Sequence, residues 1–107
     1  GASARADRGR LIAADRDAAV GAGDQSTTIG KGRSTQVGKD DALKVGKNLV
    51  IDAGDSVTIK TGSASITMKK DGTIVIKGKD ITVNGSGKIN MKASSDVVIK
   101  GSKVGIN

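Results

Sequence analysis

The chain has no aromatic residue: Phe, Tyr and Trp are all absent from its 107 residues. Aromatic side chains bury large areas and usually make up part of a small globular core. Any interior must therefore be filled by Ile, Val, Leu, Ala and the two Met residues. Proline is absent too, although glycine is frequent at 16 residues, which argues against a disordered Pro/Gly-rich linker. An interior of aliphatic side chains alone fits a narrow, regular structure better than a globular one.

Cysteine and histidine are also missing. Without Cys there is no disulfide and no thiolate metal site, and without His the commonest general base and metal ligand are gone. No apolar run approaches the roughly 20 residues that span a bilayer as a helix. We therefore expect a protein that is not an enzyme and binds no metal or cofactor.

The charge balance is basic, with 18 Lys and Arg against 11 acidic residues, all of them Asp, for a net charge of +7. A nucleic acid or an anionic membrane is one interpretation of such a charge. A solvated outer face is the interpretation we favour, because the 13 lysines are spread over residues 31–103. No aromatic side chain is present to stack on bases. We expect no nucleic-acid partner.

A short repeat dominates the sequence. From residue 43 onward an apolar residue, one spacer and a second apolar residue recur every six to nine residues, most often every eight. Alternation of this kind, rich in Ile, Val and Thr, predicts very short strands whose i and i+2 side chains share one face. The apolar pairs are Leu43/Val45, Leu49/Ile51, Val57/Ile59, Ile66/Met68, Ile74/Ile76, Ile81/Val83, Ile89/Met91, Val97/Ile99 and Val104/Ile106.

A glycine follows most of these pairs, which predicts a sharp bend with positive φ or close backbone approach. The glycines are Gly46, Gly54, Gly62, Gly72, Gly78, Gly85 and Gly101. Two-residue hairpin signals are recognised only at Asp71-Gly72 and Asn84-Gly85. Short strands that alternate with sharp bends (corners) at a nearly constant spacing predict a solenoid rather than a sandwich of hairpins.

One chain of this length would make only a few coils of a single-chain β-helix. Repeats of about eight residues that are nearly identical, here called octads, suit a different arrangement better. In it three identical chains wind together, and each chain gives one edge of a triangular prism. We predict an all-β fold: an intertwined triple-stranded β-helix of three parallel chains over residues 24–107. Residues 1–23 are expected to be an irregular adaptor or the start of the helix. Residues 1–3 fit either an expression remnant or the start of a piece of a longer chain.

The inner positions of this prism are the predicted core. They are Val45, Ile51, Ile59, Ile66, Met68, Ile74, Ile76, Ile81, Val83, Ile89, Met91, Val97 and Ile99. The last layer would leave strand edges and an open apolar bore, which proteins normally cover. We therefore expect a partner protein to cap the tip through Val104, Ile106 and Asn107.

Residues from about 24 to 107 resemble the C-terminal β-helical spike of VgrG proteins of bacterial type VI secretion systems, which is related to the needles of contractile phage tails. The resemblance lies in the octads around Thr-Ile-Gly, Gln-Val-Gly and Lys-Val-Gly. It lies further in the run SITMKKDGTIVIKGKDITV over residues 65–83 and in the ending KGSKVGIN. The large N-terminal parts of such proteins are not in this sequence.

The resemblance implies a homotrimeric spike that pierces a target membrane, touching it transiently. It implies a PAAR-repeat protein at the C-terminal tip, with an Hcp tube and the rest of VgrG on the N-terminal side. Such a spike assembles in the bacterial cytoplasm and is then secreted or injected. A phage or pyocin tail spike or fibre segment is an alternative, as is a single-chain β-helix enzyme acting on polysaccharide, although the Asp residues are dispersed over the corners.

Isolated motifs fit structural roles. The carboxylate pairs Asp40-Asp41 and Asp52/Asp55 stand at Gly-rich bends, where Asp forms turns. The segment Gly85-Ser86-Gly87-Lys88 departs from the phosphate-binding loop pattern, because its glycines are too close together and Ile follows the lysine. Met68 and Met91 are read as bore-filling residues rather than ligands.

Overall fold

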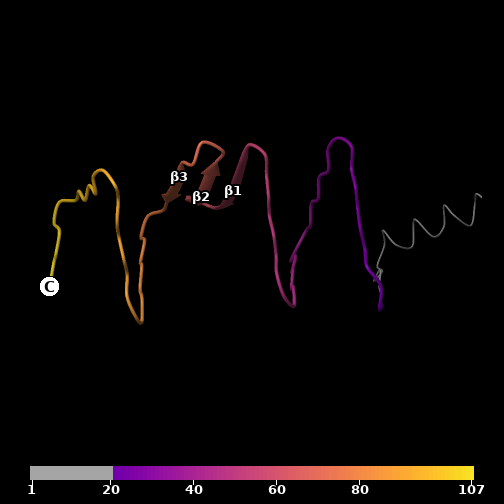
Figure 1. Cartoon of the computed structure of the whole chain (residues 1–107), viewed down its shortest axis with the longest axis horizontal. Helices are drawn as coiled ribbons and strands as arrows, with labels where there is room; N and C mark the ends of the chain where they lie inside the picture. The colour runs from indigo at the N-terminus through magenta and orange to yellow at the C-terminus, as the bar shows by residue number, and fades with distance from the viewer. Residues whose placement is uncertain (1–20) are drawn as a thin grey trace, which may run out of the picture. The chain divides into compact units, whose positions relative to one another are not determined.

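The computed structural model describes residues 21–107 and is all-β in this part (Figure 1). Its strands are β1 (Ser56–Thr61), β2 (Ala64–Lys69) and β3 (Ile74–Lys77), and the described residues contain no helix. The chain divides into two units, Gly1–Lys44 and Val45–Asn107. Residues 21–44 of the first unit carry no strand. The predicted adaptor over 1–23 lies almost wholly outside the described residues.

The three strands form one antiparallel sheet in the order β1-β2-β3 (Figure 1). Gly62 and Ser63 alone connect β1 to β2, and Gly62 has φ +54° while Ser63 does not have positive φ. A glycine with positive φ at the first central position is the signature of a type II′ hairpin turn, whose twist matches that of the strands. Gly62 is therefore a hairpin turn residue and not the corner of a solenoid.

The second connection runs from Lys70 to Thr73, and backbone hydrogen bonds close a three-residue loop, Lys70 to Gly72, within it. The Gly72 N–H donates to the Lys69 carbonyl at 3.0 Å, and the Lys69 N–H donates to the Thr73 carbonyl at 2.9 Å. Gly72 has φ +95°. This pattern fits a turn followed by a left-handed glycine that forms a bulge, the commonest three-residue hairpin loop. Gly72, which was predicted to be a solenoid corner, is therefore a hairpin residue too, at one of the two hairpin signals in the sequence.

The register sorts the side chains onto two faces, because directly opposed residues of antiparallel strands point to the same side. Val57 pairs with Met68, and Met68 with Ile74. Ile59 pairs with Ile66, and Ile66 with Ile76. We call these six residues, Val57, Ile59, Ile66, Met68, Ile74 and Ile76, the apolar face. The opposite face, which we call the polar face, carries Ser56, Thr58, Lys60, Ser65, Thr67, Lys69, Val75 and Lys77.

No residue between 21 and 107 is buried in the single chain. On the apolar face Ile66 remains 42% exposed and Ile74 64% exposed. A two-layer domain normally covers the apolar side of a sheet with another element. Within the described residues no second layer covers this one, so the chain alone forms no hydrophobic core there.

The repeats on either side of the sheet differ from the sequence prediction. Outside β1, β2 and β3, no strand is present among residues 21–107. A strand is held by hydrogen bonds to a neighbouring strand, and these repeats have none within the described chain. Of the glycines predicted to bend with positive φ, only Gly62 and Gly72 do so. No helix in this part is long and apolar enough to cross a membrane.

Candidate functional site

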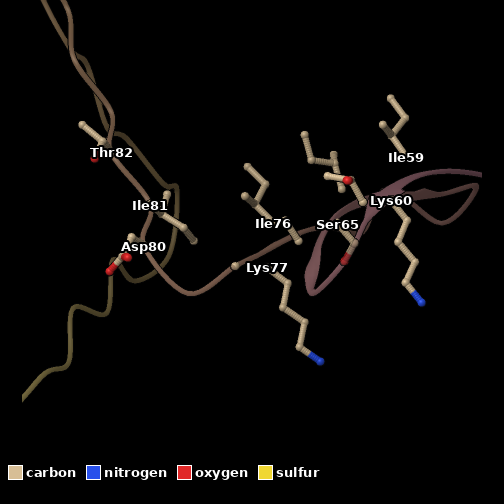
Figure 2. Close-up of a pocket in the computed structure, with 12 residues that line it drawn as sticks. Ile59, Lys60, Ser65, Ile76, Lys77, Asp80, Ile81 and Thr82 are labelled. Atoms are coloured by element: carbon tan, nitrogen blue, oxygen red, sulfur yellow. The ribbon is translucent and has the colours of Figure 1, made fainter. Parts of the chain in front are cut away.

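The apolar face of the sheet continues onto the segment that follows β3. Ile81 lies near the end of the sheet: a Cβ added to Gly78 would be 3.6 Å from Ile81 Cγ1 and 4.0 Å from Ala64 Cβ. Ile81 joins Ile59, Ile66 and Ile76 around a cavity of about 390 Å³. Figure 2 shows Ile59 and Ile76 on one side of the ribbon, with Lys60 and Lys77 pointing the other way. The result is an apolar concavity on one side of the sheet, with both lysines on the other side.

Six of the thirteen predicted core residues come together in this region: Ile59, Ile66, Met68, Ile74, Ile76 and Ile81. The other seven lie outside the sheet and are all exposed in the single chain. They are Val45, Ile51, Val83, Ile89, Met91, Val97 and Ile99. Val57, which the repeat places in an apolar pair, completes the apolar face through its pairing with Met68.

The predicted tip residues are also exposed. Ile106 is 89% exposed and Val104 50% exposed, and Asn107 is exposed as well. Unlike the sheet, this segment has no strand partner within the described chain. Its backbone groups and two aliphatic side chains are therefore accessible in the single chain.

The polar face carries a second cavity, also of about 390 Å³. Thr58, Lys60, Ser65, Thr67 and Lys77 contribute to its lining. Sequence reasoning did not single out these residues, because they occupy spacer and corner positions of the repeat. The signal that could have found them is the register: once the hairpin turns are assigned, Lys60, Ser65 and Lys77 fall opposite one another on three adjacent strands.

Polar contacts in the described part cluster at the β2–β3 turn. Lys70 Nζ lies 3.3 Å from Asp55 Oδ1, and the Lys70 N–H donates to the Asp55 carbonyl at 3.0 Å. Both side chains of this ion pair are well exposed, so it contributes little to stability. The Thr73 N–H donates to Asp71 Oδ1 at 3.0 Å, and this bond lowers the pKa of the Asp71 carboxyl.

None of these groups forms a recognisable catalytic arrangement. Residues 21–107 contain no group of three acidic, His or Cys side chains that could hold a metal ion. The pairs Asp40-Asp41 and Asp52/Asp55 belong neither to the apolar concavity nor to the polar cavity. What the arrangement can do is bind: an apolar surface on one side and a basic, hydroxyl-bearing cavity on the other. No protein-family model matches the chain, and no curated protein matches it.

Proposed function

We propose that this chain is a structural, non-enzymatic protein that works as a parallel homotrimer, the shaft of a membrane-piercing spike. The observation that carries the proposal is the uncovered apolar face. Its six side chains are all aliphatic or Met, and most of them are well exposed in the single chain. Large exposed apolar patches mark interaction surfaces.

Without a partner, the isolated sheet is only weakly stable. Three short strands with an uncovered face are at the margin of independent stability. Burying an Ile side chain is favourable by about 1.5–3 kcal/mol relative to leaving it exposed. Covering Ile59, Ile74 and Ile76, which are 60–64% exposed, would therefore contribute several kcal/mol per chain. Association supplies the second layer that the chain lacks.

Identical copies are the partner that the repeat favours. Three apolar faces turned toward one axis enclose a triangular interior, and each copy then meets the same surroundings. The flanking octads, which have no strand partner in the described chain, would pair with octads of neighbouring copies. In the flanking octads this arrangement would be an intertwined triple-stranded β-helix of parallel chains, with the antiparallel sheets of the three copies packed around the same axis. Closing the structure around an axis also leaves fewer free strand edges.

The mechanical role comes from the resemblance of residues 24–107 to the spike of VgrG proteins in type VI secretion systems. A rod of interlocked chains unfolds only if the chains separate together, so it can transmit axial load. In such a machine the Hcp tube and the rest of VgrG lie on the N-terminal side. The spike assembles in the bacterial cytoplasm and is driven out into a target cell, contacting its membrane transiently.

We place the contact with a partner protein at the C-terminal tip, residues 104–107. Val104, Ile106 and Asn107 are exposed in the single chain and offer two aliphatic side chains to such a partner. A PAAR-repeat cone fits this position. Deleting residues 104–107 is expected to abolish capture of a cognate PAAR protein in a pull-down, while the trimer stays intact.

A pair of substitutions gives the matched control. Ile106→Asp adds a carboxylate at the tip, and Val98→Asp adds one at an exposed spacer position away from it. We expect the first variant to lose the PAAR protein and the second to retain it. Equal capture by the truncated and full-length trimers would show that the tip is not the site of attachment.

A further inference from the structure

The polar face of the sheet brings two lysines to either side of one serine. Ser65 on β2 is the register partner of both Lys60 on β1 and Lys77 on β3. Two strand spacings, about 9.5 Å, therefore separate the lysine backbones. The four-carbon stem of Lys is flexible enough for two ammonium groups to converge on one ligand above the serine. Figure 2 shows the Lys60 and Lys77 side chains extending from the same side of the sheet.

Hydroxyl groups line the space between these lysines. Thr58 and Thr67 are register partners that lie two residues along their strands from Lys60 and Ser65, on the same face. Both line the cavity of about 390 Å³ together with Ser65. Ser65 and Thr67 are half-buried, whereas Lys60 and Lys77 are exposed. The hydroxyls thus form the floor of the cavity and the lysines its rim. A hydroxyl can donate one hydrogen bond and an ammonium group three, so the cavity is rich in donors.

The cavity contains no negative charge. No Asp is among its lining residues, and within residues 21–107 no carboxylate forms an ion pair with Lys60 or Lys77. The two lysines therefore lie on either side of Ser65 without a counterion from the described chain. An anion placed between them would be attracted by both charges and accept hydrogen bonds from the hydroxyls below.

We propose that this cavity is a binding site for a phosphate group, with Lys60 and Lys77 as the charged clamp and Ser65 as the central donor. A phosphate offers several acceptor oxygens to donors that approach from different directions, and lysine binds it as a point charge. The site does not depend on the trimer, because the apolar face points the other way. In a trimer each copy would keep its own site on the outer surface.

The test uses the full chain and inorganic phosphate as the probe, followed by NMR of the backbone amides. We expect the amide signals of Ser65 and Thr67 to shift and to saturate on the order of millimolar phosphate, more weakly as salt is added. The double variant Lys60→Gln/Lys77→Gln is expected to bind about tenfold more weakly, since each exposed charge contributes modestly. Ser65→Ala, a second variant that keeps both charges, should also weaken binding.

The matched control is Lys88→Gln/Lys92→Gln, which removes the same charge from residues outside the cavity. Its affinity for phosphate should stay within about twofold of the parent chain. Equal weakening in both double variants would overturn the proposal, because binding would then follow net charge. An absence of shifts at Ser65 and Thr67 in the parent chain would overturn it as well.

A vesicle experiment distinguishes the two sources of the phosphate. Vesicles of phosphatidylglycerol mixed with phosphatidylcholine are sedimented with each variant. If the Lys60→Gln/Lys77→Gln variant loses vesicle binding and the Lys88→Gln/Lys92→Gln variant keeps it, the site recognises a lipid headgroup phosphate. If vesicles bind none of the chains while inorganic phosphate still shifts Ser65, the ligand is a soluble phosphate compound. Either result supports the site.

Discussion

Adjacent residues of β3 provide a sharp test of whether the apolar face is covered in solution. Ile76 belongs to the apolar face and Val75 to the polar face, and in the single chain Ile76 is 62% exposed and Val75 43% exposed. Aspartate at either position adds one carboxylate to the same strand. If the chain worked alone, Val75→Asp would be at least as damaging as Ile76→Asp, because Val75 is the less exposed residue.

A covered apolar face reverses this order. Full burial of Ile stabilises by about 1.5–3 kcal/mol, so covering the exposed 62% of Ile76 contributes about 1–2 kcal/mol. Ile76→Asp loses that contribution and places a carboxylate in an apolar interior beside its copies, for a total loss of at least about 3 kcal/mol per chain. Val75→Asp should cost about 1 kcal/mol, mainly through strand propensity.

The assay is urea unfolding followed by far-ultraviolet circular dichroism, since the chain has no aromatic residue to report by fluorescence. Protein concentration must be held fixed, because the stability of an oligomer depends on it. Losses of equal size in the two variants, or a larger loss in Val75→Asp, would refute the covered face.

Two further predictions follow from local geometry. A Cβ added at Gly85 would lie 2.8 Å from Ile89 Cγ1, whereas a Cβ added at Gly87 would have nothing within 4 Å. Gly85→Ala should therefore lower the free energy of unfolding by about 1–3 kcal/mol and so lower the melting temperature. Gly87→Ala should leave both nearly unchanged. Similar melting temperatures for both would argue against this contact. The Thr73 N–H lowers the pKa of Asp71, so carbon NMR should give a pKa below the ordinary 3.8. Because the pKa of Asp71 is lowered in the folded chain, its contribution to stability is present above pH 3.8 and is lost as the pH falls through that lowered pKa. A measured pKa at or above 3.8 would contradict the hydrogen bond from the Thr73 N–H.

The repeat in the sequence predicted the composition of the apolar face well. Side chains alternate strictly between faces in a strand, so the pairs at Ile66/Met68 and Ile74/Ile76 had to share a side once strands formed. The Asp71-Gly72 turn was also recognisable from the sequence, because it combines a turn-forming Asp with a glycine that accepts positive φ.

The direction of the strands was not predicted. The Gly62-Ser63 connection was read as a solenoid corner, although a Gly-Ser pair between two alternating runs is also a hairpin signal. Periodicity gives the face of a residue and not the strand with which it pairs, so it could not separate the two. The polar cavity was missed for the same reason, since Lys60 and Lys77 are 17 residues apart in sequence and become neighbours of Ser65 only through the register.

The number of chains per particle in solution tests the central claim most directly. Size exclusion coupled to light scattering measures it without assuming a shape. Three chains of 10.7 kDa each predict a particle of about 32 kDa that persists on dilution. A particle of 10.7 kDa, or a dimer, would contradict the account, because the apolar face would then not be enclosed by three copies of the chain.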